Sequence, residues 1–176
     1  MIKIKTILLP MDGSACSWKA LEYALAIARR HGARVLAFHV VDRAMVEHIR
    51  PLLQVAVPSA ERLATMQKEY EANASAFLGE VVGMPETSGV EIATDWVTGL
   101  PAEDIVKHAT GIRADLIVMG THGRRGVSHL LLGSVAERVV RTAPCPVLTV
   151  RSDARDAVEV PRSPEGGVAA TAPDSE

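Results

Sequence analysis

The sequence predicts a doubly wound α/β fold, in which helices cover both faces of a parallel β-sheet. Short runs of aliphatic and β-branched residues alternate along the chain with longer segments whose apolar residues recur at helical spacing. Aromatic residues make up only 3% of the 176 residues, so the core must be aliphatic, which suits strands buried on both faces. With 48% apolar and 23% charged residues, the chain can fill one core well, and we expect a single domain.

The first β-α-β unit is expected near the N-terminus. Residues 4–9 form an aliphatic run that predicts a strand, and the Asp-Gly-Ser sequence at 12–14 then supplies turn and helix-capping chemistry. Residues 17–31 carry an apolar stripe at helical spacing and end at Gly32, which predicts a helix with a glycine stop. Residues 34–41 are nearly all apolar, as expected of a second strand that is covered on both faces.

Helices and strands continue to alternate along the rest of the chain. The remaining expected elements are a helix, a strand, a helix, a strand, a helix and a strand, at residues 60–82, 90–97, 101–111, 116–119, 134–142 and 147–150. Right-handed crossovers between successive strands then give five parallel strands with helices on both faces.

The C-terminal segment differs in composition from the rest. Residues 152–176 contain no Leu, Ile or aromatic residue and carry six acidic residues against two arginines. Such a segment cannot bury enough apolar surface to order itself. The sequence therefore predicts a folded domain over residues 1–151 and a disordered acidic tail over 152–176.

The net charge and the cysteine content limit which classes of binding partner and which cellular compartment we expect for this protein. The net charge of −2 gives no electrostatic reason to expect binding to nucleic acid or to an anionic membrane. No apolar stretch approaches the length of a membrane span, and no signal peptide is recognised. The two cysteines, Cys16 and Cys145, form no metal-ligand pattern and are interpreted as packing residues rather than redox switches. We expect a soluble, cytoplasmic protein.

A glycine-rich segment between two expected elements is the most informative part of the chain. It reads GTHGRRGVSHLLLGS from Gly120 to Ser134, directly after an expected strand and at the start of an expected helix. In doubly wound sheets, ligands bind beyond the carboxyl ends of the strands. Glycines let the backbone approach an anion closely, and a helix start offers unpaired N–H groups. The segment therefore predicts a polyphosphate site.

A simpler interpretation competes at each position of this segment. Gly120 and Gly123 are expected to turn their N–H groups inward, but a single glycine more often serves only a turn or helix packing. Four glycines and a serine in this place favour the ligand interpretation. Arg124 and Arg125 lie between the two anion-binding elements and are placed to reach outer phosphates.

The spacing GxxG-x9-GS that begins at Gly120 is similar to the signature of the nucleotide-binding branch of the universal stress proteins. The sequences PMDGS at residues 10–14 and HVVD at 39–42 resemble two further landmarks of that family, and the resemblance covers about residues 2–151. It implies a strand order of 3-2-1-4-5, ATP as the ligand, and a homodimer formed through the last strand, residues 146–151.

The resemblance also implies which residues contact the nucleotide. Pro10, Met11 and Asp12 would lie against the base and ribose, and Val40 would line the adenine pocket. Met119 and Gly120 would close the nucleoside side. The residues implied to follow and cap the phosphates are Thr121, His122, Gly123, Arg124, Arg125, Gly126, Gly133, Ser134, Val135 and Ala136.

Three of the polar candidates have a second interpretation. Asp12 is as well explained by a turn or an N-cap as by a ligand role, and the resemblance favours the ligand role. His122 and His129 lack a metal-ligand pattern, so a solvated or backbone-bonded imidazole is favoured over a metal ligand or a general base. We assign no metal site and no catalytic residue.

Several functions compete on this sequence. The first is an ATP-binding regulator of the stress response, whose interaction with a regulatory protein partner depends on nucleotide occupancy. The second is an enzyme that slowly hydrolyses ATP or transfers its phosphate, with Mg²⁺ held by Asp12 or a loop acid; the sequence lacks a GxxxxGK[ST] loop, which weakens this alternative. The third is a nucleotide-free dimeric scaffold of the same fold, which predicts a disrupted glycine signature, whereas this chain keeps the signature whole. An adenylating pyrophosphatase expects an SGGxDS loop that is missing here.

Overall fold

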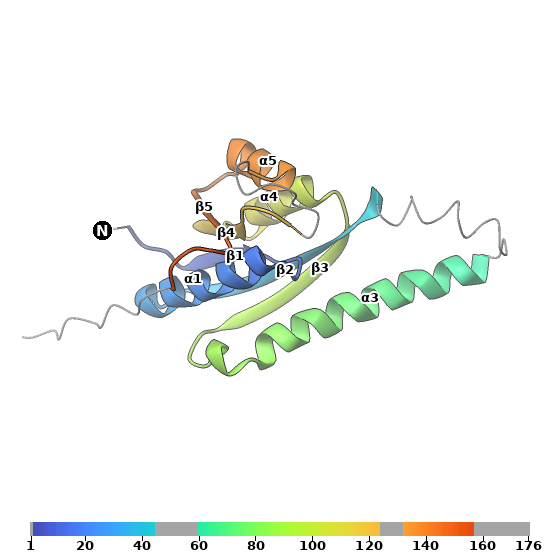
Figure 1. The fold of residues 1–176 in the computed structure, drawn as a ribbon, viewed down its shortest axis with the longest axis horizontal. Coiled ribbons are helices and arrows are strands. Elements are labelled where there is room, and N and C mark those ends of the chain that lie inside the picture. The colour runs from blue at the N-terminus through green and yellow to red at the C-terminus, as the bar shows by residue number, and fades with distance from the viewer. Residues whose placement is uncertain (1, 45–59, 124–131, 157–176) are drawn as a thin grey trace, which may run out of the picture.

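The computed structural model describes residues 2–44, 60–123 and 132–156 (Figure 1). Five parallel strands form one sheet in the order β3-β2-β1-β4-β5, which confirms the predicted fold and strand order. The strands are β1 (Thr6–Pro10), β2 (Arg34–Asp42), β3 (Ile92–Gly99), β4 (Leu116–Gly120) and β5 (Val147–Val150). The helices are α1 (Ala15–His31), α3 (Ala60–Gly83), α4 (Pro101–Gly111) and α5 (Ser134–Thr142), with a short 3₁₀ helix η1 (Pro85–Thr87) after α3.

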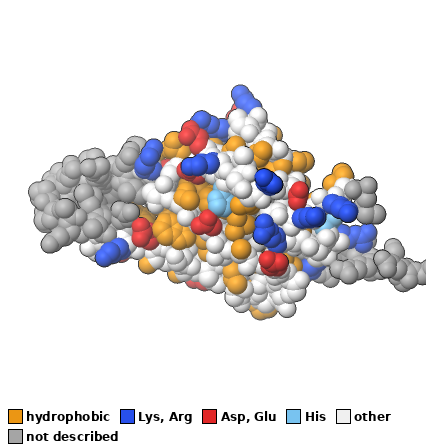
Figure 2. Space-filling view, turned by 180° about the vertical axis from the view of Figure 1, so that it is seen from behind, with side chains coloured by type: hydrophobic (Ala, Val, Ile, Leu, Met, Phe, Trp, Pro, Cys, Tyr) orange, Lys and Arg blue, Asp and Glu red, His pale blue; other side chains and the backbone are white. Residues whose placement is uncertain are grey.

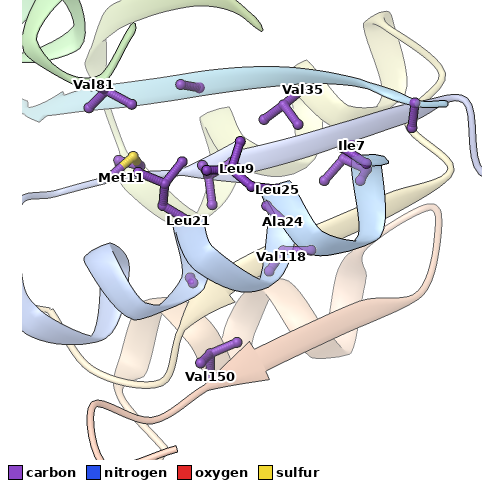
Figure 3. Packing of buried hydrophobic residues seen from close by; sticks show 14 of the residues in the cluster. Ile7, Leu9, Met11, Leu21, Ala24, Leu25, Val35, Val81, Val118 and Val150 are labelled. Carbon is purple, nitrogen blue, oxygen red and sulfur yellow. The ribbon is translucent and has the colours of Figure 1, made fainter. Parts of the chain in front are cut away.

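The sheet separates two layers of helices. Helices α1 and α3 pack on one face, where side chains such as Leu21, Leu25 and Val81 meet Leu9 and Val35 of the sheet (Figure 3). Helices α4 and α5 pack on the other face around a second group of buried residues. Its members are Leu8, Phe38, Ala102, Ile105, Ala109, Ala114, Ile117, Met119, Ala136 and Val139. Seen from behind, acidic and basic side chains are interspersed among hydrophobic ones (Figure 2).

Helix α1 begins and ends where the local chemistry requires it. The Ser14 hydroxyl accepts a hydrogen bond from the Ser17 N–H at 3.2 Å, so Ser14 is the N-cap and the helix starts at Ala15, slightly before the predicted start. Gly32 adopts φ 63°, a left-handed conformation that ends the helix. The first predicted crossover is therefore present, with its boundaries shifted by the cap.

Strand β3 lies later in the chain than the sequence indicates. Its residues Ile92–Gly99 pair in parallel with Val35–Asp42 of β2, whereas residues 90–97 were expected. The Val90 N–H instead donates to the Thr87 carbonyl at 3.2 Å, which extends the turn that follows η1. Local turn bonds thus delay the start of the strand.

Asp115 joins β1 and β4 at their amino ends. Its Oδ2 accepts hydrogen bonds from the backbone N–H groups of Lys5 at 2.8 Å and Thr6 at 2.9 Å. These two bonds favour the ionised carboxylate and hold the pKa of Asp115 below its usual range. The contact spans more than one hundred positions of the chain, and it stabilises the centre of the sheet.

Contacts with α1 continue past the predicted domain boundary at residue 151. Ala154 packs against the cluster between α1 and the sheet, and the Tyr23 hydroxyl donates to the Arg155 carbonyl at 2.7 Å. Lys19 forms an ion pair with Asp156 at 2.6 Å. Residues 152–156 therefore lie against the domain, and the rest of the predicted tail, 157–176, lies outside the described residues.

Two further observations concern the cysteines and the apolar character of the helices. Both cysteines are free, with Cys16 buried and Cys145 half-buried, and burial raises the pKa of the Cys145 thiol. Among the helices that the structure describes, none combines the length and apolar character needed to cross a membrane.

Candidate functional site

The candidate site lies where the winding of the sheet reverses. Strands β1 and β4 are neighbours at the centre of the sheet, and the chain leaves β1 for a helix on one face but leaves β4 toward a helix on the other. Figure 1 shows α1 and α5 on opposite sides of these two strands. In open α/β sheets the crevice formed by such a reversal is where ligands bind.

Asp12 follows β1 at this point and forms a local turn. Its Oδ1 accepts hydrogen bonds from the Ser14 N–H at 3.0 Å and from the Ser14 hydroxyl at 2.6 Å. Ser14, not Asp12, caps α1. The N-cap interpretation of Asp12 is therefore wrong, and its carboxylate serves the turn while lying at the crevice.

The loop after β1 touches the segment after β4. A Cβ atom placed on Gly123 would stand 2.6 Å from Asp12 Oδ2, and the Ser14 hydroxyl lies 3.2 Å from the His122 carbonyl oxygen. The two segments are more than one hundred residues apart in sequence. Gly123 is thus small because the carboxylate of Asp12 occupies the space beside it.

Gly120 has a different reason to be glycine. A Cβ at this position would lie 2.7 Å from the Cβ of Cys16 and 2.9 Å from its backbone carbon, so Gly120 lets α1 pack closely on β4. Of the two interpretations that the sequence leaves open for Gly120, the geometry supports helix packing. Close contact with α1, rather than a turn, is what requires glycine at position 120.

Three apolar candidates on the strand ends bury their side chains. Pro10 is buried at the end of β1, Met11 is 3% exposed in the α1 layer, and Met119 is 5% exposed in the α4 and α5 layer. Val40 is half-buried and packs against the same layer as Met119. Any contact of Met11 or Met119 with a ligand in this arrangement would therefore come from the backbone.

The start of α5 forms the second wall of the candidate site. Gly133 is the N-cap, and no side chain of the described residues caps the helix. The Gly133 N–H donates to the Thr121 carbonyl at 2.9 Å, which ties the helix start to the end of β4. Ser134 is exposed, Val135 half-buried and Ala136 buried. The first turn therefore offers backbone N–H groups to an anion.

The His122 ring lies between these parts and is neither solvated nor bonded to the backbone as expected. Its Nδ1 is 3.1 Å from the Thr121 hydroxyl, and its Nε2 is buried without a hydrogen-bond partner among the described residues. The ring carbon next to Nε2 stands 3.9 Å from the Cβ position of Gly133. Buried polar atoms are normally paired, so this nitrogen is a candidate contact for a bound ligand.

Two residues of this region hold the site in shape although the sequence does not indicate them as site residues. Ser14 bridges Asp12 and His122, and His39 on β2 lies 2.7 Å from the Met11 carbonyl oxygen through its Nδ1. Both stand in the family landmarks, but no spacing in the sequence indicates contacts across so many residues.

Several candidates remain untested by the geometry. Arg124, Arg125, Gly126 and His129 lie outside the described residues. Within residues 2–44, 60–123 and 132–156, no group of three or more His, Cys, Asp and Glu side chains stands close enough to hold a metal ion.

Comparison with known proteins identifies the universal stress protein family. The profile of the universal stress protein family matches residues 3–151. Universal stress protein MJ0531 of Methanocaldococcus jannaschii is 41% identical over 153 residues, which cover 86% of this chain and 85% of the relative. The structure of protein MJ0577 of the same organism superposes with a TM-score of 0.72 at 28% identity and covers 85% of this chain and 97% of that one. A universal stress protein solved in complex with cAMP superposes at 0.62 with 25% identity, over 86% and 99% of the two chains.

Proposed function

This chain belongs to the universal stress protein family, and we propose that it binds an adenine nucleotide, with ATP as the first candidate, between β1 and β4. The nucleotide would lie on the residues that follow β1, on those that follow β4, and on the first turn of α5. Nucleotide occupancy would regulate the interaction of this protein with a partner protein during stress.

One observation carries the proposal: the loops after β1 and β4 meet at the switch point, with Asp12 Oδ2 against Gly123. Beside them, α5 begins at Gly133 without a side-chain cap among the described residues, and the buried Nε2 of His122 lies next to that start. A carboxylate suits a ribose hydroxyl, whereas helix N–H groups suit a phosphate. The solved relative in complex with cAMP supports an adenine nucleotide as the class of ligand.

The proposal needs no catalytic residue. Mg²⁺ would reach the site with the nucleotide phosphates, as magnesium commonly does, and Asp12 is the carboxylate of the switch point that suits this ion. Hydrolysis is a separate outcome, measured by phosphate release in the same experiment.

The test is calorimetric titration of nucleotide-free protein with ATP, ADP, AMP and cAMP, with and without Mg²⁺. We expect saturable binding, weakened about tenfold in Gly123→Ala because the new methyl group displaces the Asp12 carboxylate. Ser134→Ala tests the start of α5. Gly79→Ala is the matched control, since its Cβ would meet nothing within 4 Å. No binding at millimolar nucleotide would overturn the proposal and leave a nucleotide-free scaffold.

We also propose a homodimer that forms through β5. This strand is an edge of the sheet, and the Ile117 N–H donates to the Pro146 carbonyl while the Thr121 N–H donates to that of Val150. Because backbone groups alternate in direction along a strand, those of Val147 and Thr149 point away from β4. Thr149→Pro would remove an outward donor and is expected to give monomers by analytical ultracentrifugation, whereas Thr149→Val would stay dimeric. Monomeric wild-type protein would contradict this part.

We propose the cytoplasm as the compartment of this protein. The only two cysteines of the chain, Cys16 and Cys145, are unpaired. Free thiols are typical of reducing compartments.

A further inference from the structure

His39 sits on β2 beside the end of β1 and binds the backbone there. Its Nδ1 lies 2.7 Å from the carbonyl oxygen of Met11. A carbonyl oxygen can only accept a hydrogen bond, so the Nδ1 of His39 must carry the proton. The bond therefore fixes which nitrogen of the neutral ring carries the hydrogen.

Both backbone groups of Met11 are held by β2. The Met11 N–H donates to the Phe38 carbonyl at 2.8 Å, and the Met11 carbonyl accepts from His39. The peptide bond that joins Met11 to Asp12 is planar and trans, so its C=O and N–H point in opposite directions. With the carbonyl directed at β2, the N–H of Asp12 is directed toward β4, on the side of the crevice.

The ring of His39 is itself held in place from α3. Phe77 meets it in an edge-to-face contact, with ring centroids 5.4 Å apart and an interplanar angle of 66°. Phe77 also meets Trp18 of α1 edge-to-face, with centroids 5.7 Å apart. Such contacts restrict how the imidazole can rotate. The direction of the Met11–Asp12 peptide is thus set by β2 and α3, although neither element is part of the candidate phosphate loop.

We propose that His39 is a positioning residue for nucleotide binding. By holding the Met11 carbonyl, it turns the Asp12 N–H and the Asp12 turn toward the crevice between β1 and β4. This inference rests on the proposed nucleotide site and adds to it a residue that would not touch the nucleotide. This role requires a hydrogen-bond donor to the Met11 carbonyl at the position of the His39 Nδ1, whichever side chain supplies it.

The test compares two variants of His39 in the full chain. His39→Leu removes the donor and keeps an apolar side chain against Phe77, and we expect ATP binding to weaken about tenfold. His39→Asn places an amide N–H near the position of Nδ1, and we expect binding within about threefold of wild type. Binding is measured well below the unfolding temperature of each variant. Ile105→Val, in the buried layer on the other face, is the control for a mild loss of stability without loss of binding.

Nitrogen NMR of the histidine ring and of the backbone gives a second readout that needs no nucleotide. The ring of His39 should show a protonated Nδ1, and the amide signal of Asp12 should move in His39→Leu and return in His39→Asn. Wild-type affinity in His39→Leu would overturn the inference while leaving the nucleotide site intact. Equal losses in both variants would likewise reduce His39 to a packing residue. If wild-type protein bound no nucleotide, the proposed function would fail and the inference with it, even where the amide of Asp12 followed His39.

Discussion

At each end of the sheet an aspartate lies between the segments of β1 and β4: Asp115 at the amino end and Asp12 at the carboxyl end. The two carboxylates have different partners. At the amino end, Asp115 accepts the N–H groups of Lys5 and Thr6 from the neighbouring strand. At the carboxyl end, Asp12 accepts from the N–H and the hydroxyl of Ser14 in its own loop, and its other oxygen faces Gly123 of the opposite segment.

The difference follows from what surrounds each carboxylate. Asp115 supplies the acceptor for the backbone N–H groups of Lys5 and Thr6, so its contribution is to stability. Asp12 lies where two helices start on opposite faces, and helix starts leave backbone N–H groups without partners inside the helix. We therefore expect the amino end of this sheet to serve stability and the carboxyl end to serve the proposed nucleotide site.

The largest expected effect is a loss of stability on substitution of Gly120. This residue lies at the carboxyl end of the sheet but serves packing, so the division of roles between the two ends is not complete. Gly120→Ala would push a methyl group within 2.7 Å of Cys16 Cβ and within 2.9 Å of its backbone carbon. Neither atom can move without α1, so we expect a loss of about 3 kcal/mol in the free energy of unfolding. Urea denaturation measures it. Gly111→Ala, with open space around its Cβ, is the control; equal losses in both variants would contradict the packing role.

The next prediction compares the same substitution, aspartate to alanine, at the two ends of the sheet. Asp115→Ala leaves two backbone N–H groups without their acceptor, and we expect it to destabilise the fold by about 2 kcal/mol. Asp12→Ala should change the free energy of unfolding by less than about 1 kcal/mol, because the hydrogen bonds that Asp12 accepts from Ser14 lie within its own half-buried turn, but should weaken ATP binding. The opposite pattern in urea denaturation and calorimetry would refute the assignment of the two ends.

The pKa of Asp115 adds a pH dependence to that prediction. Since its pKa is lower in the folded protein than in the unfolded chain, its contribution to stability is complete above about pH 4 and is lost as the pH falls through the folded value. The difference in stability between wild type and Asp115→Ala should therefore shrink below about pH 4. Urea melts at successive pH values would show this.

The smallest expected effect concerns the end of the chain. A chain that stops at residue 151 loses the packing of Ala154 and the hydrogen bond from Tyr23 to the Arg155 carbonyl. We expect its melting temperature to fall by about 2–4 °C, whereas a chain that stops at residue 156 should melt like the full protein. Calorimetric scans compare the three. Identical melting of all three would support the domain boundary at residue 151 that composition predicts.

Local patterns explain why so much of the fold could be predicted. The aliphatic runs and the helical stripe of residues 17–31 report burial directly, so every strand and helix that was expected is present. The start of β3 was misplaced because the turn bond between Val90 and Thr87 depends on geometry that composition does not encode. Spacing identified the glycine segment, but not why each glycine is there.

Contacts between distant residues account for what was missed at the site. Gly120 is fixed by Cys16, Ser14 by His122, and Met11 by His39. Each pair joins two elements that only the sheet order brings together. The glycine signature pointed to the switch point between β1 and β4 as a candidate site, whereas the residues that hold this region in shape became visible only with the strands in register.

The division of the interior by the sheet has a consequence for how this protein can change over generations. Buried residues of the α1 and α3 layer and those of the α4 and α5 layer form two separate clusters. Substitutions more than about 7–10 Å apart with no shared partner usually have additive effects on stability. Substitutions in the buried helix residues of one layer should therefore depend little on those in the helix residues of the other, so lineages can change one layer while keeping the other.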